Sequence, residues 1–379
     1  MSARSTLVVL GLSLSSSWGN GHATTYRALL KAFAARGHDV LFLEREVPWY
    51  AEHRDVTAPD YCELAFYSDL SDLARFRARI AGADAVVVGS YVPDGREVGR
   101  LVQAWARGVT AFYDIDTPVT LAALERGECA YLSPELIPGY DLYLSFTGGP
   151  TLRRIEARYG SPAARALYCS VDPDAYPPAR REPRWDLSYL GTYSSDRQPA
   201  LERLLLEPAR RCPDLRFAVA GPQYPDGIAW PANVERFEHV GPADHAEFYG
   251  VSRYTLNVTR ADMVRAGWSP SVRLFEAAAT GTPIVSDRWE GLDTLLTDGR
   301  EILLADGSDD VVAILTGRSE AERAEGADAA RRRILRHHSA AHRAAELDGY
   351  LDEARGARSG RLAADSAGLW APAREKVTS

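Results

Sequence analysis

The sequence predicts an α/β protein with two doubly wound parallel sheets, and three observations carry this prediction. Apolar runs of strand length alternate with helical segments along the chain. The alternation pauses at a proline-bearing stretch that ends at Pro178 and then starts again. The length of 379 residues also exceeds what one typical core accommodates. We therefore expect two Rossmann-like domains, with a ligand cleft between the carboxyl ends of their sheets.

In the first half, continuous apolar runs are typical of buried parallel strands. The helix over residues 23–36 ends at Gly37, and a second helix is expected over 96–107. Strands are expected at residues 7–12, 40–43, 85–89, 110–113 and 142–145, of which the last completes this sheet.

In the second half, a helix is expected over residues 199–211 and a helical tail over 320–355, followed by a frayed polar end. Strands are expected at residues 187–190, 217–220, 255–258, 284–286 and 302–305. The resulting organisation is a first domain, a linker, a second domain, and a C-terminal helix with its tail, at residues 1–170, 171–178, 179–340 and 341–379.

Composition excludes several classes of protein. The net charge of −8, from 44 basic and 52 acidic residues, does not suit a dedicated nucleic-acid binder, so no nucleic-acid partner is expected. The sequence contains no apolar run of membrane-spanning length and no signal-peptide cleavage pattern. The four cysteines form no CxxC pair, which fits a reducing compartment. We expect a cytoplasmic protein; the oligomeric state is left open.

The segment GWSPSVRLFEAAATGTPIVSD, from Gly267 to Asp287, is the most informative in the chain. A loop that carries Ser269 and Ser271 leads into a short apolar helix, where Ser271 is suited to act as the cap. Glu276 lies inside the helix, Gly281 ends it, and a buried strand follows. The pattern therefore predicts a loop, a helix N-terminus and a carboxylate at the carboxyl edge of a sheet.

Such a helix N-terminus favours phosphate, because its N–H groups have no partner and its dipole attracts negative charge. Glu276, about one turn further in, is suited to accept two hydrogen bonds from a ribose diol. The segment therefore predicts a pocket for a nucleotide diphosphate. The alternative is an ordinary helix of an α/β protein with an isolated glutamate.

Five strings of the sequence are characteristic: SSWGNGHATTYRALLKAFAARGHDV, DIDTP, YCSVDPDAY, LGTYSSDRQPALERLL and NVTRADMVRAGWSPSVRLFEAAATGTPIVSD. Together they resemble the GT-B glycosyltransferases and, among these, the CgeB-type spore-maturation branch with its C-terminal group 1 domain. The resemblance covers roughly residues 5–315. Glu276 matches the second of the two glutamates that many retaining GT-B enzymes carry, and Trp268 stands in place of the first.

This resemblance implies a donor site on the second domain. Arg197 would contact the diphosphate, with Arg260 and Arg273 as further candidates, because GT-B enzymes stabilise the leaving diphosphate without a bound metal. Gly221 and the segment 237–241 would line the nucleobase, unless both are ordinary strand-end turns. The other donor-side candidates are Gly21, Gly191, Thr192, Ser269 and Ser271.

On the first domain, His22 begins a helix after a serine-rich loop and faces the expected cleft. Inverting GT-B enzymes often place a general base at this position, oriented by an aspartate such as Asp116. The alternatives for His22 are a helix-capping role and a contact to the sugar or acceptor. The remaining candidates on this side contact sugar or acceptor: Trp18, Asn20 and Asp114.

The sequence as a whole predicts a metal-independent glycosyltransferase, specifically a hexosyltransferase, without a cofactor. Its donor would be a UDP-, dTDP- or GDP-sugar, and its acceptor, a glycan or a small metabolite, is left open. A retaining outcome is favoured over an inverting one, and His22 would then contact sugar or acceptor. Two alternatives remain: a sugar-nucleotide 2-epimerase and a sugar-nucleotide-binding protein without catalysis. His338 and His342 lack the HExxH form of a zinc site, and no metal is expected.

Overall fold

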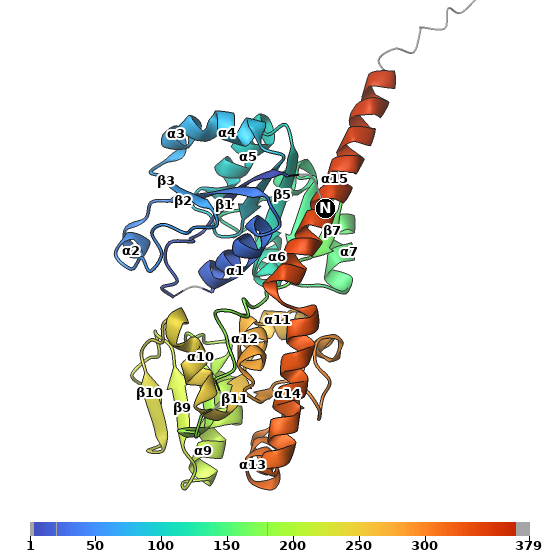
Figure 1. The fold of residues 1–379 in the computed structure, drawn as a ribbon. Coiled ribbons are helices and arrows are strands. Elements are labelled where there is room, and N and C mark those ends of the chain that lie inside the picture. The colour runs from blue at the N-terminus through green and yellow to red at the C-terminus, as the bar shows by residue number, and fades with distance from the viewer. Residues whose placement is uncertain (1–3, 20, 180, 369–379) are drawn as a thin grey trace, which may run out of the picture.

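The computed structural model describes residues 4–19, 21–179 and 181–368 and contains two parallel sheets, one in each half of the chain (Figure 1). The first sheet has seven strands in the order β3-β2-β1-β4-β5-β6-β7. The strand order reverses between β1 and β4, so the topological switch point of the sheet lies between these two strands. The strands are β1 (Thr6–Gly11), β2 (Asp39–Arg45), β3 (Glu63–Tyr67), β4 (Ala85–Gly89), β5 (Val109–Asp114), β6 (Leu142–Ser145) and β7 (Ala164–Ala166).

Helices connect these strands and cover both faces of the sheet. Successive residues of β1 point to opposite faces, so Leu7 and Val9 enter one apolar cluster while Val8 and Leu10 enter another. The helices are α1 (His22–Ala34), α2 (Pro48–Ala51), α3 (Leu70–Leu73), α4 (Arg77–Gly82), α5 (Gly95–Trp105), α6 (Thr117–Glu125) and α7 (Pro150–Tyr159), with 3-10 turns at Ala74–Phe76 and Pro134–Gly139.

The second sheet has six strands in the order β10-β9-β8-β11-β12-β13, which are β8 (Trp185–Leu190), β9 (Phe217–Ala220), β10 (Val234–Phe237), β11 (Ser252–Asn257), β12 (Ile284–Ser286) and β13 (Leu303–Leu304). Its helices are α8 (Gln198–Leu201), α9 (Glu207–Arg211), α10 (Pro242–Gly250), α11 (Ala261–Ala266), α12 (Val272–Thr280), α13 (Ser308–Gly317) and α14 (Glu320–His337). A π-helical turn, Glu202–Leu206, joins α8 to α9, and a 3-10 turn lies at Leu292–Thr294.

Three strands of the structure were not expected from the sequence: β3, β7 and β10. Each lies at an edge of its sheet, where one side of the strand has no neighbour. Only Val234 of β10 is fully buried, and β7 is three residues long. The expectation that β6 completes the first sheet was therefore wrong, because β7 pairs with it along Tyr143, Leu144 and Ser145.

The expected helical tail is two helices rather than one. Helix α14 ends at His337, and α15 (Ala340–Gly368) begins after Ser339, whose neighbour Ala340 donates a backbone hydrogen bond to Val171. Helix α15 returns to the first half, where Leu347 packs in the core beside α1 and Arg36 pairs with Asp348 at 2.7 Å. The expected fraying before residue 368 was wrong, and the part of the tail over 369–379 lies outside the described residues.

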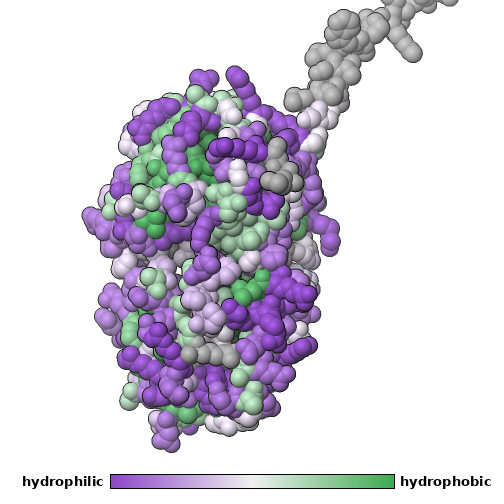
Figure 2. Space-filling model, in the orientation of Figure 1, coloured by the Kyte–Doolittle hydropathy of each residue, from purple (hydrophilic) through white to green (hydrophobic). Residues whose placement is uncertain are grey.

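On the face shown in Figure 2, hydrophilic side chains cover most of both halves, and hydrophobic ones form small separate patches. Within the described part of the chain, no helix is long and apolar enough to cross a membrane.

Candidate donor and reaction site

A cavity of about 550 Å³ lies between the two halves, at the carboxyl ends of both sheets. Its first wall consists of the loop after β1, the start of α1 and the residues after β5 and β6. Its second wall consists of the loops after β8, β9 and β11 together with the start of α12. This volume fits a ligand of nucleotide-sugar size.

Helix α12 presents its N-terminus to the cavity, as the sequence predicted. Ser271 stands at the cap position, but its hydroxyl makes no cap and donates to Asn257 Oδ1 at 2.6 Å. The expectation of a serine cap was therefore wrong, and the N–H groups of the first turn retain no side-chain cap. This leaves the helix N-terminus able to bind an anion.

Arg273 is 7% exposed and is held in place by the second sheet. Its Nε donates to the Leu190 carbonyl at 2.7 Å and its Nη1 to Asn257 Oδ1 at 2.8 Å, while the guanidinium lies over the Tyr189 ring. A Cβ on Gly191 would lie 2.8 Å from Arg273 Nη2. Arg273 thus brings a fixed positive charge to the cavity wall and requires a glycine beside it.

Glu276, the predicted ribose ligand, lines the cavity and is 3% exposed. Tyr176 donates to its Oε1 at 2.7 Å, and Tyr249 donates to its Oε2 at 3.2 Å. Burial raises the pKa of both tyrosines well above the usual range, so both phenols remain donors at neutral pH. The sequence analysis missed both tyrosines, because linker and α10 approach Glu276 only in the fold.

The loop after β8 meets the loop after β9 closely. Gly221 has a φ of +147°, and a Cβ on it would lie 2.1 Å from the Gly191 carbonyl oxygen. Arg197 Nη2 donates to the Thr192 carbonyl at 2.7 Å, whereas its buried Nε has no hydrogen-bond partner among the described residues. The structure thus brings these predicted diphosphate residues together on one wall, and Arg197 retains donor capacity there.

His22 begins α1, is 8% exposed and lines the cavity. Burial lowers its pKa below 6.5, and the nearby charge of Asp116 opposes this shift. Its Nδ1 is buried and has no hydrogen-bond partner among the described residues. Asp116 lies 3.9 Å from Arg260 of the second half. The predicted residues His22 and Asp116 thus line the same cavity, but no described residue forms a hydrogen bond with His22 Nδ1.

Asp114, a predicted contact to sugar or acceptor, is not among the residues that line the cavity. It is fully buried and accepts hydrogen bonds from Tyr143 at 2.5 Å and from Thr120 at 2.7 Å. Burial raises the pKa of this carboxyl to about 7. Asp114 ends β5 with its side chain inside the fold, whereas Asp116, two residues later in the loop, reaches the cavity.

Ser269 and Trp268 connect the two halves and are not among the residues that line the cavity. Ser269, a predicted donor-side residue, is 1% exposed and shares a hydrogen bond of 2.9 Å with Thr147 of the first half. Trp268 has a φ of +42° and accepts a backbone hydrogen bond from Gly148 at 2.9 Å. Its ring occupies the space where a Cβ on Gly149 or Gly291 would lie.

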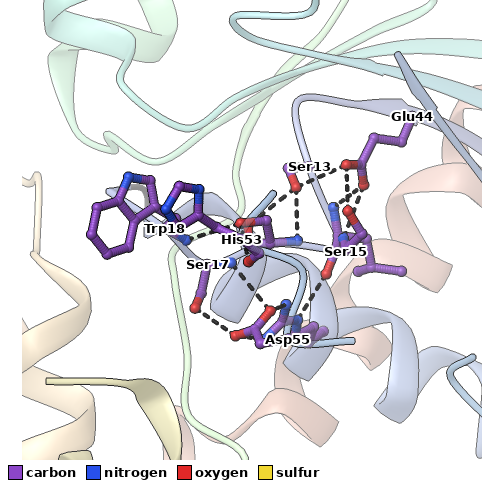
Figure 3. A network of polar contacts seen from close by, with 10 residues as sticks. Ser13, Ser15, Ser17, Trp18, Glu44, His53 and Asp55 are labelled. Atoms are coloured by element: carbon purple, nitrogen blue, oxygen red, sulfur yellow. Dashed lines mark hydrogen bonds and ion pairs between the residues drawn. The ribbon is translucent and has the colours of Figure 1, made fainter. Parts of the chain in front are cut away.

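The serine-rich loop after β1 is held by two carboxylates (Figure 3). Glu44 of β2, 1% exposed, accepts four hydrogen bonds from the backbone and hydroxyls of the segment 13–15. Asp55 accepts from the Ser17 hydroxyl at 2.6 Å. This support fixes Trp18, which stacks on His53 with ring centroids 4.3 Å apart.

Trp18 also reaches His239 of the second half, at 5.1 Å between ring centroids. Trp18 is not among the residues that line the cavity, whereas its neighbours Ser17 and Gly19 and the predicted Gly21 are. Its predicted contact to sugar or acceptor stays a prediction. Asn20 lies outside the described residues. Cavity residues that the sequence analysis missed include Tyr50, Tyr91, His245 and Tyr249.

The segment after β10 lines the cavity with His239 and Val240, while the Phe237 carbonyl accepts from the Gly221 N–H. The predicted base-side residues Gly221 and 237–241 are thus adjacent. Among the residues whose side chains are described, no group of three or more His, Cys, Asp and Glu is placed to hold a metal ion.

The chain's fold is that of the GT-B glycosyltransferases, two parallel sheets with helices that face each other across a cavity. Residues 197–349 match a family model described as "Glycosyl transferase-like". No curated protein matched the sequence. Fold and family match together support a GT-B glycosyltransferase, and neither identifies the CgeB-type branch.

Solved structures show the fold likeness over nearly the whole chain. Sucrose-phosphate synthase from Thermosynechococcus elongatus is 14% identical, with a TM-score of 0.69 over 93% of this chain and 100% of its own. The Anabaena protein HepE, solved with UDP and glucose, is 12% identical, with a TM-score of 0.67 over 92% of this chain and 100% of its own. The catalytic domain of starch synthase IV from Arabidopsis thaliana, bound to ADP and acarbose, is 11% identical, with a TM-score of 0.63 over 93% and 100%.

Proposed function

We propose that the protein is a metal-independent glycosyltransferase that moves a sugar from a nucleotide-diphosphate sugar to an acceptor hydroxyl. One observation carries the proposal: the buried carboxylate of Glu276 lies in the same cavity wall as the uncapped N-terminus of α12 and two arginines. A carboxylate for the ribose and a positive region for the diphosphate are what such a donor requires. The family match over 197–349 and the neighbours solved with UDP or ADP support this assignment.

In the proposed donor complex, Glu276 accepts hydrogen bonds from the ribose hydroxyls. The N–H groups at the start of α12, Arg197 and Arg273 bind the diphosphate and stabilise its charge as the sugar departs, which is the task that a metal would otherwise perform. The base lies along Gly221 and the segment after β10. The sugar then points toward the wall that carries His22 and Asp116, where the acceptor enters.

We further propose a retaining outcome. The bond between the anomeric carbon and the diphosphate breaks, the acceptor oxygen takes its place, and the acceptor proton passes to the departing diphosphate oxygen. Within the described part of the chain, His22 Nδ1 has no hydrogen-bond partner, Asp116 included, which favours a ligand contact over an oriented general base. His22 therefore contacts the transferred sugar or the acceptor.

The test is a thermal-shift and calorimetric panel of UDP, GDP, dTDP and ADP, each with and without EDTA. We expect one diphosphate to raise the melting temperature regardless of EDTA, because a ligand that binds only the folded state stabilises it. Glu276→Ala should weaken that binding about 100-fold, since a buried charged acceptor is lost. Glu247→Ala, at an exposed position of α10, is the control and should bind as the wild type does.

Failure of all four diphosphates to bind, or equal binding by Glu276→Ala, would contradict the proposal. Release of free nucleotide from the matching sugar donor only when acceptor is added would separate transfer from the alternatives. Conversion of the donor without acceptor would instead indicate an epimerase. Tight binding without turnover against any acceptor would indicate a binding protein.

A further inference from the structure

The segment that connects the two halves contributes a side chain to the surroundings of Glu276. Tyr176 belongs to the segment that connects the two halves, between β7 and β8, and it is 6% exposed. Its hydroxyl donates to Glu276 Oε1 at 2.7 Å and lies 3.1 Å from His245 Nδ1. A connecting segment thus places a polar group directly on the carboxylate that the ribose would use.

The Glu276 carboxylate retains acceptor capacity beyond the hydrogen bonds from the two tyrosines. An ionised carboxylate offers about four lone-pair positions, two on each oxygen. Tyr176 takes one on Oε1 and Tyr249 takes one on Oε2. His245 Nδ1 also lies 3.6 Å from Oε2. Each oxygen retains acceptor capacity beyond its tyrosine for the adjacent hydroxyls of a ribose, and the two phenols restrict rotation of the carboxylate about its terminal bond.

The same segment is also attached to the first half. Asp172 pairs with Lys31 of α1 at 2.7 Å, and the Tyr176 N–H donates to the Asp172 carbonyl at 3.2 Å. Helix α1 begins at His22, in the opposite wall of the cavity. The segment that carries Tyr176 is therefore attached to α1 of the first half, while the Tyr176 side chain contacts Glu276 of the second half. Such attachment suits a residue that orients another side chain.

We propose that Tyr176 is a positioning residue for donor recognition, which holds the Glu276 carboxylate in the orientation that accepts both ribose hydroxyls. Tyr249 does the same at the second oxygen. This inference rests on the proposed function, because it assigns a role toward the ribose of the donor. It makes recognition of the ribose depend on a residue of the connecting segment as well as on the second sheet and its helices.

The test compares UDP with 2′,3′-dideoxy-UDP by calorimetry on the full chain, or the ADP or GDP pair if the panel selects that base. Tyr176→Phe removes one oxygen and leaves the ring. We expect it to weaken UDP binding about tenfold, because a hydrogen bond to a charged group is lost. Binding of the dideoxy compound should change less than about twofold, since it has no hydroxyls for Glu276 to accept.

Tyr254→Phe is the matched control, because the Tyr254 hydroxyl is buried in the second sheet, in β11, and has no hydrogen-bond partner among the described residues. It should leave both affinities unchanged. Tyr249→Phe is the second route and should reproduce the ribose-selective loss if Tyr176→Phe fails to fold. Equal weakening of both ligands, or no weakening of either, by both tyrosine variants would overturn the inference while the proposed function stands. Absence of binding to the wild type would refute both.

Discussion

The two walls of the cavity differ in how firmly their polar side chains are held. On the wall from the second half, Arg273 and Glu276 each make two hydrogen bonds within the protein. On the opposite wall, His22 has a ring nitrogen without a partner among the described residues, and Asp116 meets Arg260 only at 3.9 Å. Under the proposed function, the wall from the second half is preorganised for the nucleotide, and the opposite wall completes its contacts when sugar and acceptor bind.

The largest expected effect comes from His22→Ala, which acts on the less constrained wall. We expect kcat to fall by about 100-fold or more, because a contact made during transfer is lost. Nucleoside diphosphate affinity should stay within about twofold, since the fixed wall is intact. Steady-state kinetics with calorimetry would measure both, and His337→Ala, at an exposed position, is the control. A loss of nucleotide affinity that matches the loss of kcat would remove the distinction between the walls.

A smaller effect is expected from Arg197→Ala, on the preorganised wall. Its Nε has no hydrogen-bond partner among the described residues, and under the proposed function the diphosphate would accept from this arginine. Affinity for the diphosphate should fall about tenfold, and more at low salt than at high salt. Affinity for the corresponding nucleoside, which lacks phosphate, should not change. Calorimetry at two ionic strengths checks this, with the exposed Arg203→Ala as control, and equal loss for the nucleoside would place Arg197 in a structural role.

The smallest effect concerns pH. Burial lowers the pKa of His22 and Asp116 raises it in opposition, so the imidazole is neutral at neutral pH. As pH falls, kcat should remain constant through 6.5 and decline only below it. Asp116→Asn removes the attraction for the imidazolium, so the decline should begin at a still lower pH. A pH profile of kcat for both proteins is the measurement, and a shift of the decline to higher pH would contradict this assignment.

The sequence predicted the central strands of both sheets well because these strands are buried on both faces and read as continuous apolar runs. The edge strands β3, β7 and β10 escaped because they are short or only partly buried, as in the Val234–Phe237 strand. Pairing of an edge strand with its single neighbouring strand leaves no pattern in the sequence by which the strand could be recognised. These three edge strands are therefore recognised only in the fold, whereas β13, which also lies at an edge, was expected from the apolar residues at 302–305.

The same contrast holds for the site. Glu276, Arg197 and Gly191 stand in local strings from which a donor site was predicted, and the structure brings them together in the cavity lining. Tyr176 and Tyr249 have no such pattern, because only tertiary structure places them on Glu276. The sequence did not show that Asp114 is buried, because strand alternation, which decides between core and cavity, is ambiguous where a strand gives way to a loop.

The return of α15 to the first half has a consequence for biosynthesis. Leu347 and Leu351 of α15 belong to the same core as Leu7 of β1 and Leu29 of α1. In the sequence, all strands of the second sheet lie between these two pairs of leucines. During translation the first sheet is made early, yet this side of α1 stays uncovered until α15 has left the ribosome. Apolar surface there is exposed throughout synthesis of the second sheet. The nascent first half is thus a candidate client for chaperones, and its maturation waits for the synthesis of α15.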